Sequence, residues 1–296
     1  MTITSARYEG RVPVRDGRVL GIAEFGPPTA EQTVIWFHGT PGARRQVPEA
    51  ARRYAFDHGI RLIGMDRPGV GLSTAHLYHR LADVTDDLEV ALERLGVGRF
   101  SAVGLSGGAP YALATAHAFP DQVPTVGILS GVVPSGGEDG RDGGLVGIVN
   151  RFKPVLPMLS EPVGSLLTTF VRVARPIAPY ALDLYARLSP PADRVVLSVP
   201  EHREMFLDDV LGSGRHGMRA AGYDAILFTR DWGFSVRDVG ARVVWWHGDE
   251  DNIVPIAHAH HIVPLLPHAE LRVVSGGGHL CGLEVGVDVL ETVLAW

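Results

Sequence analysis

Short apolar runs alternate with longer amphipathic stretches along most of the 296-residue chain. The short runs are rich in β-branched and aromatic side chains and are bounded by glycine or proline, as is typical of buried strands. They cover residues 19–25, 33–37, 60–65, 100–105, 126–129, 242–246 and 271–274. Helical patterns lie between most of them, and this alternation predicts an α/β fold with a mostly parallel central sheet and helices on both faces.

Two helices can be bounded from the pattern alone. In the first, apolar residues recur at helical spacing and Gly96 stands where a glycine commonly ends a helix; these residues are Val84, Leu88, Ala91, Leu92 and Leu95. The second helix is expected from about residue 107 to 119, directly after a predicted strand, with Pro120 ending it.

The alternation stops between residues 134 and 217. A glycine-rich loop at 135–144 is followed by apolar helical patterns that prolines interrupt. We therefore expect a helical cap at 134–217, inserted into a core domain made of residues 1–133 and 218–296. The cap is rich in apolar side chains. Such side chains are typical either of a lid that lines an apolar substrate pocket or of packing against the sheet edge. The apolar residues of the cap include Val146, Ile148, Val149, Val155, Leu156, Leu159, Val163, Leu166, Leu167, Phe170 and Val171.

Charge and composition exclude several classes of protein. The net charge is −6, and the chain lacks the dense basic run that binding nucleic acid needs. A single cysteine, Cys281, cannot form an internal disulfide, so the cytoplasm is the expected location. The first residues lack the apolar core of a signal peptide, and no stretch reaches the ~18–20 apolar residues of a spanning helix. We expect no transmembrane segment, while peripheral membrane contact through the cap and the oligomeric state stay open.

Ser106 lies in the sequence Gly104-Leu105-Ser106-Gly107-Gly108, between a predicted strand and a predicted helix. A sharp turn from strand to helix forces the serine into a strained conformation, which is possible only when the residues two before and two after it are small. Gly104 and Gly108 satisfy this requirement. Ser106 is therefore expected to be an exposed nucleophile.

A serine hydroxyl needs a base to take its proton and an acid to orient that base. Among the 13 histidines we favour His279, because the flexible loop before it follows a predicted strand and can carry an imidazole over the rim of the sheet. The acid is expected in the loop at 248–255, which follows another predicted strand. Asp251 is favoured and Asp249 is the alternative, since one such carboxylate often braces the loop itself.

The oxyanion of an acyl-transfer reaction needs two converging backbone N–H groups. One is expected from Gly107, which follows the nucleophile at the start of a helix. The second is expected from the segment His38-Gly39-Thr40-Pro41-Gly42, directly after a predicted strand. Thr40 is favoured there, because Pro41 has no N–H and the glycines let the loop turn back over the site.

Four motifs carry a resemblance to a known family: residues 38–42, residues 66–73, the turn at Ser106, and the loop at 248–255 together with His279. The order of serine, acid and histidine along the chain is also that of α/β-hydrolases. The chain therefore resembles the α/β-hydrolase fold superfamily, and within it the capped serine hydrolases such as esterases, proline iminopeptidases and cofactor-free haloperoxidases. The resemblance implies that residues 66–73 brace the floor of the site and that no cofactor is needed.

Other candidate groups carry less weight. Histidines and carboxylates that could suggest a metal site gather late in the chain, namely His247, Asp249, Glu250, His258, His260 and His261. Histidines two positions apart on a helix point in different directions, so no metal site is predicted from them. We expect His38 to be structural and to pin the oxyanion loop. Cys281 is expected to be a small buried residue and not a reactive thiol.

The sequence thus predicts a serine hydrolase that cleaves a small or medium apolar carboxylic ester through an acyl-enzyme. Two alternatives stay open. A proline-iminopeptidase-like enzyme needs acidic groups for the amino terminus of a peptide, and Thr40 replaces the glycine that such peptidases usually carry; the acidic residues available are Glu201, Glu204, Asp208 and Asp209. A catalytically silent, ligand-binding member of the fold is the second alternative.

Overall fold

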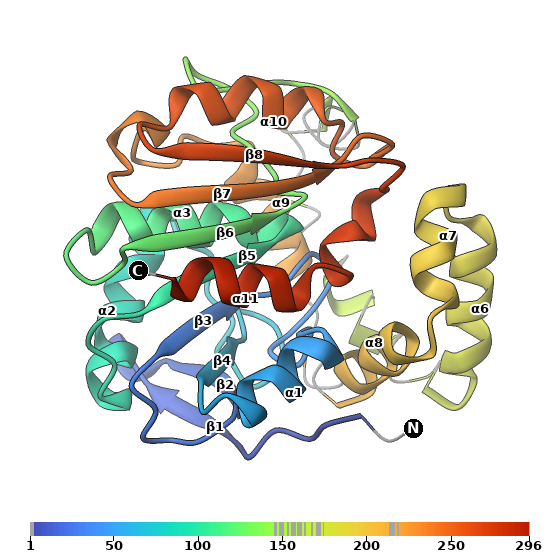
Figure 1. Ribbon diagram of the computed structural model, residues 1–296, viewed down its shortest axis with the longest axis horizontal. Coiled ribbons are helices and arrows are strands. Elements are labelled where there is room, and N and C mark those ends of the chain that lie inside the picture. Colours follow the sequence, from blue (N-terminus) through green and yellow to red (C-terminus); the bar gives the residue numbers. More distant parts are fainter. Residues whose placement is uncertain are drawn as a thin grey trace.

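One sheet of eight strands organises the described residues, with helices on both of its sides (Figure 1). The computed structural model describes residues 3–295 except 145–146, 148–150, 153, 155–157, 159–161, 163, 167, 170–172, 174, 213–216 and 218. The order of the strands across the sheet is β1-β2-β4-β3-β5-β6-β7-β8. They are β1 (Tyr8–Pro13), β2 (Val19–Phe25), β3 (Thr33–Phe37), β4 (Arg61–Met65), β5 (Ser101–Leu105), β6 (Thr125–Leu129), β7 (Arg242–Gly248) and β8 (Ala269–Val274).

The sheet is mostly parallel, as the alternating pattern predicts. Only the β1–β2 and β2–β4 pairs are antiparallel, and the other neighbours pair in parallel. The carboxyl ends of β3, β5, β7 and β8 therefore meet at one edge, and every predicted site residue follows one of these ends. Strand β1 was not predicted, because this edge strand buries only Val12 and shows no apolar alternation.

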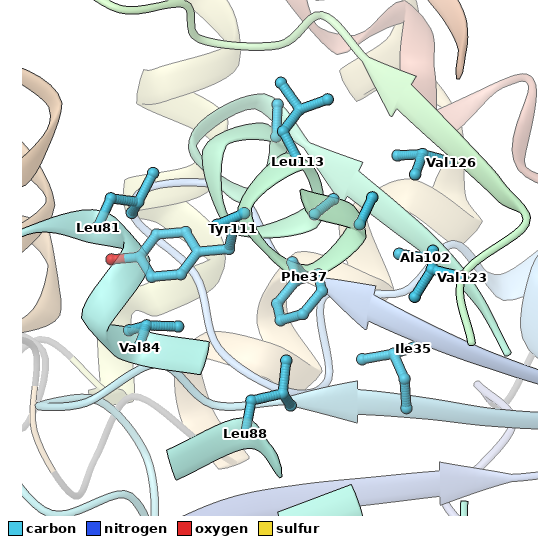
Figure 2. Packing of buried hydrophobic residues seen from close by; sticks show 14 of the residues in the cluster. Ile35, Phe37, Leu81, Val84, Leu88, Ala102, Tyr111, Leu113, Val123 and Val126 are labelled. Atoms are coloured by element: carbon cyan, nitrogen blue, oxygen red, sulfur yellow. The ribbon is translucent and has the colours of Figure 1, made fainter. Parts of the chain in front are cut away.

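Helices α1 (Glu49–Asp57) and α11 (Gly286–Leu294) pack on one face of the sheet, and α2 (Val84–Leu95), α3 (Ala109–Ala118) and α10 (Ala257–Ile262) pack on the other. Helix α2 ends at Gly96, whose φ of 62° is the left-handed conformation predicted for it. Figure 2 shows Val84 and Leu88 of α2 beside Phe37 of β3 and Tyr111 of α3. Burying each such aliphatic side chain stabilises the fold by about 1.5–3 kcal/mol. None of the described helices is both long and apolar enough to cross a membrane.

The connection between β6 and β7 is helical, which confirms the predicted insertion. In its described part it contains α6 (Ala178–Leu188), α7 (Pro191–Ser198), α8 (Pro200–Gly212) and α9 (Ala220–Phe228), which we call the β6–β7 helices. In Figure 1, α6, α7 and α8 lie beyond the carboxyl ends of the parallel strands. The limits of the cap at 134 and 217 stay a prediction.

Most of the apolar residues predicted for the cap lie outside the described residues. Leu166, the exception, is 70% exposed. The remaining members of that set lie outside the described residues: Val146, Ile148, Val149, Val155, Leu156, Leu159, Val163, Leu167, Phe170 and Val171.

Candidate active site

Ser106 stands at the turn between β5 and α3 with a φ of 49°, a left-handed conformation that is rare for a residue with a side chain. The bracketing glycines make this turn possible. A Cβ on Gly104 would lie 2.6 Å from the Cα of Ala109, and one on Gly108 would lie 2.1 Å from the carbonyl oxygen of Phe37. Both obstacles are backbone atoms, so no side chain can be accommodated at either position.

His279 contacts this serine from the loop after β8. Its Nε2 lies 2.8 Å from Ser106 Oγ, and its Nδ1 lies 2.8 Å from Asp251 Oδ2. Because the carboxylate favours a proton on Nδ1, Nε2 is left free to accept the serine proton. The structure therefore brings Ser106, His279 and Asp251 into one hydrogen-bonded chain. All three residues are mostly buried, so the expectation of an exposed Ser106 is wrong: the residues around the turn cover it.

The Asp251 carboxylate is held from several directions. Its Oδ1 accepts hydrogen bonds from the backbone amides of Ile253 and Val254, each at 2.9 Å. Burial alone would raise the pKa of Asp251, but the side chains of His247 and His279 outweigh burial and hold that pKa well below its ordinary value. Asp251 is therefore ionised at neutral pH and can stabilise a protonated His279.

Asp249, the alternative acid, lies elsewhere. Its carboxylate is exposed, and its Oδ1 accepts a hydrogen bond of 2.7 Å from the amide of Gly276. This contact ties the loop after β7 to the loop that carries His279. Asp249 thus braces the two loops, while Asp251 contacts the histidine.

His247 is a part of this cluster that the sequence analysis considered only as a metal ligand. Its ring is fully buried at the end of β7, and Nδ1 accepts a hydrogen bond of 3.1 Å from Trp245 Nε1. The proton must then lie on Nε2, which is 2.7 Å from the Val254 carbonyl oxygen and 3.3 Å from Asp251 Oδ2. The sequence feature that could have indicated this role is a histidine near the end of a buried strand, just before the acidic loop.

The described residues contain no cluster of three or more potential metal ligands.

The loop after β3 brings Thr40 against Gly107, the two residues predicted to form the oxyanion hole. A Cβ on Gly107 would lie 2.3 Å from Thr40 Oγ1. The neighbouring amide of Gly39 is already engaged by Gln46 Oε1 at 2.5 Å. No described residue accepts a hydrogen bond from the Thr40 amide. That amide is therefore free to bind an oxyanion.

His38 occupies the structural position expected for it. Its Nδ1 lies 2.8 Å from the Gly39 carbonyl oxygen, and its Nε2 accepts a hydrogen bond of 3.3 Å from the Arg67 amide. Burial and the nearby Arg67 charge lower the pKa of His38 well below its ordinary value, so the ring stays neutral.

Asp66 joins the loop at 66–73 to the loop after β3. Asp66 accepts hydrogen bonds from the Arg44 amide at 2.7 Å and from the Leu72 amide at 2.8 Å.

Cys281 is fully buried, and burial raises the pKa of its thiol to about 11, so it carries no reactive thiolate at neutral pH.

The acidic residues considered for binding a peptide amino terminus have partners in the protein. Glu201 pairs with Arg53 at 3.1 Å, and Asp208 pairs with Arg45 at 2.8 Å. Asp209 is buried and accepts hydrogen bonds from the backbone amides of Ala43 and Arg45, at 2.9 and 3.0 Å. Glu204 also has an interaction partner. Glu201, Asp208 and Asp209 thus join α8 to the core.

Comparison with known proteins agrees with this architecture. The sequence model of the alpha/beta hydrolase fold matches residues 32–141. Among solved structures, the chain is similar to a bromoperoxidase from Bacillus anthracis, with a TM-score of 0.70 and 19% identity over 97% of this chain and 99% of that one. It is also similar to an esterase from Exiguobacterium antarcticum, with a TM-score of 0.67 and 17% identity over 97% of this chain and 98% of that one.

A carboxylesterase structure from Nitrososphaera gargenis is similar as well, with a TM-score of 0.68 and 16% identity over 97% of this chain and 98% of that one. No curated protein sequence matches the chain. At these identities the likeness concerns the fold. The protein has the alpha/beta hydrolase fold, as its motifs indicated.

Proposed function

We propose that this protein is a serine hydrolase that cleaves a carboxylic ester of a small or medium apolar substrate through an acyl-enzyme. The observation that carries the proposal is the hydrogen-bonded chain from Ser106 Oγ through His279 to Asp251, with 2.8 Å at each step. The strained turn at Ser106 supports it, because backbone strain of about 1–3 kcal/mol persists mainly where function requires it.

In the proposed first half-reaction, Ser106 Oγ attacks the ester carbonyl carbon while His279 Nε2 accepts its proton. The negative charge that develops on the carbonyl oxygen is stabilised by the amides of Gly107 and Thr40. The tetrahedral intermediate collapses as His279 returns the proton to the leaving alkoxide, and an alcohol departs. Throughout, ionised Asp251 stabilises the imidazolium without taking its proton.

In the second half-reaction, water replaces the alcohol. His279 removes a proton from the water as its oxygen attacks the acyl carbon. The same two amides stabilise the second oxyanion, and His279 then protonates Ser106 Oγ as the carboxylic acid leaves. The cycle consumes one water and ends with the starting protonation states.

An ester is favoured over an amino-terminal peptide by the partners of the acidic residues. An aminopeptidase needs a carboxylate free to bind an ammonium group. Glu201, Asp208 and Asp209 instead bind arginines or backbone amides of the core. The structural neighbours include proteins named as esterases, which supports the same choice at the level of fold.

The test is a substrate panel with p-nitrophenyl esters of increasing acyl length, a proline arylamide and a lactone. We expect turnover of the esters by the wild type and none by Ser106→Ala. Turnover confined to the proline arylamide would replace the esterase proposal with the peptidase. Absence of turnover on every substrate by a folded wild type would favour a catalytically silent, ligand-binding protein.

A further inference from the structure

The hydroxyl of Thr40 is fully engaged inside the protein. Oγ1 donates a hydrogen bond of 2.6 Å to Asp224 Oδ2 and accepts one of 2.7 Å from Arg67 Nη2. It also packs against Gly107, where it would lie 2.3 Å from an added Cβ. The Thr40 side chain thus joins the loop after β3 to α9, which carries Asp224.

Asp224 is held by three separate parts of the fold. Its Oδ2 accepts from Thr40 after β3 and from Arg67 after β4, the latter at 2.7 Å. Its Oδ1 accepts a hydrogen bond of 2.7 Å from Tyr111 Oη on α3, and the Arg67 guanidinium lies 5.0 Å from the centre of the Tyr111 ring. Asp224, Arg67 and Tyr111 are all buried. Charged groups that are fully paired in a buried network have little freedom to move.

Arg67 also fixes the peptide that contains the Thr40 amide. Its Nη2 donates a hydrogen bond of 2.9 Å to the Gly39 carbonyl oxygen, which lies 2.8 Å from His38 Nδ1 as well. The Gly39 carbonyl and the Thr40 N–H belong to one planar trans peptide and point in opposite directions. Holding the carbonyl toward Arg67 therefore directs the Thr40 N–H away from it. A Cβ on Gly39 would lie 3.6 Å from Ser106 Cβ, so this peptide borders the nucleophile.

We propose that Asp224 is a positioning residue for the oxyanion hole, acting through the hydroxyl of Thr40 and through Arg67. Asp224 anchors the Thr40 hydroxyl and the Arg67 guanidinium. Arg67 in turn holds the Gly39 carbonyl. Together these contacts direct the Thr40 amide toward the oxygen of the acyl group bound to Ser106. A helix between β6 and β7 thereby sets the geometry of catalysis. This inference rests on the proposed function.

A role limited to packing must be distinguished from positioning. A packing contact predicts lower stability with little change in the relative affinity for tetrahedral adducts. Positioning predicts weaker stabilisation of every tetrahedral species on Ser106, even when the variant stays folded. The hydroxyl, and not the size of residue 40, is the required feature, so serine should replace threonine.

The experiment compares Thr40→Val, which keeps the shape without the hydroxyl, Thr40→Ser, which keeps the hydroxyl, and Asp224→Asn. Asp209→Asn is the matched control, because Asp209 also joins a β6–β7 helix to the loop after β3 but does not contact Thr40. For each variant, kcat and KM are measured on one ester. The inhibition constant of phenylboronic acid, which forms a tetrahedral adduct with the serine, and the melting temperature are measured as well.

We expect Thr40→Val and Asp224→Asn to lower kcat by about 10- to 100-fold with KM nearly unchanged, somewhat less than outright loss of an oxyanion donor causes. The inhibition constant of the boronic acid should rise in parallel, and Thr40→Ser should stay within about threefold of wild type. The proposal is overturned if folded Thr40→Val and Asp224→Asn bind the boronic acid like wild type, or if Asp209→Asn weakens it equally. If wild type has no ester turnover, the proposed function fails, while the boronic acid series still decides this inference.

Discussion

The loop after β7 and the β6–β7 helices both bring carboxylates to the candidate active site, but these carboxylates bind backbone amides at very different distances along the chain. Asp251 binds amides two and three residues ahead of it. Asp193, Asp209 and Asp224, from α7, α8 and α9, bind Leu280, Ala43 and Thr40, which are 87, 166 and 184 positions away.

The two groups of carboxylates also differ in what they hold. The loop carboxylate orients the proposed base directly. The three helix carboxylates are buried, and each binds a segment that carries a proposed catalytic group or directly follows one. Local turns orient each member of the proposed triad, although the fold brings Ser106 and His279 together over 173 positions. The loops that surround the proposed triad are instead held by helices from the connection between β6 and β7.

Removal of the nucleophile should have the largest effect. Ser106→Ala is expected to lower kcat/KM by about 10⁵- to 10⁶-fold, because the remaining groups then act without a nucleophile. Ser106→Gly should lose as much activity, yet be more stable than Ser106→Ala by about 1 kcal/mol, since glycine accepts the φ of 49° without strain. Ester kinetics and urea unfolding measure both. Equal stability of the two variants would show that no strain is stored at this turn.

Substitutions of the two loop carboxylates, Asp251 and Asp249, should affect kcat very differently. Asp251→Asn is expected to lower kcat by about 10⁴-fold, because an amide does not favour the required tautomer of His279. Asp249→Asn, in the same loop, should change kcat by less than about tenfold, since it only braces the loop. Steady-state kinetics on one ester decides the matter. The reverse ranking would assign the role of acid to Asp249.

A helix carboxylate should give stability a distinctive pH dependence. Burial raises the pKa of Asp209 to about 7, whereas an aspartate in an unfolded chain titrates near 3.9. Between these values the folded protein binds more protons, so the contribution of Asp209 to the free energy of unfolding is greatest at low pH and declines as the pH rises through 7. Asp209→Asn should remove this component. The free energy of unfolding of Asp209→Asn minus that of wild type should therefore rise by up to about 4 kcal/mol from pH 4 to 8. Urea titrations at each pH measure this difference. A difference that does not change with pH would contradict the assignment.

The contact between α7 and the histidine loop should have the smallest effect. Asp193 Oδ1 accepts a hydrogen bond of 2.8 Å from the Leu280 amide, next to His279. Asp193→Ala leaves that buried amide without its partner and should cost about 1–3 kcal/mol of stability. Asp183→Ala, which breaks a partly exposed pair with Arg203 on neighbouring helices, should cost less than about 1 kcal/mol. Thermal unfolding compares them, and equal losses would show that the Asp193 contact contributes nothing special.

The part of the site that could be predicted follows from local physical requirements. The glycines around Ser106 are demanded by backbone atoms within 3 Å, and the strand-loop pattern located His279 and the acidic loop. Asp251 and Asp249 could not be separated from the sequence, because both fit the same turn and only packing buries one of them. The edge strand β1 escaped prediction because its pairing, and not its apolar pattern, defines it.

The roles of the helix carboxylates were beyond prediction for a different reason. Asp208 and Asp209 were plausible ligands for a substrate ammonium group on composition alone. Their partners, Arg45 and the amide of Ala43, lie over 160 positions away, and no local pattern encodes such a contact. The link between Asp224 and Thr40 has the same character.

The central claim is that Ser106 is a nucleophile activated by His279. Labelling with a fluorophosphonate, followed by mass spectrometry of the labelled peptide, tests it most directly. The account predicts one covalent adduct on Ser106 in the wild type, much slower labelling in a folded His279→Ala variant and none in Ser106→Ala. An adduct on another residue, or equal labelling of wild type and Ser106→Ala, would contradict it.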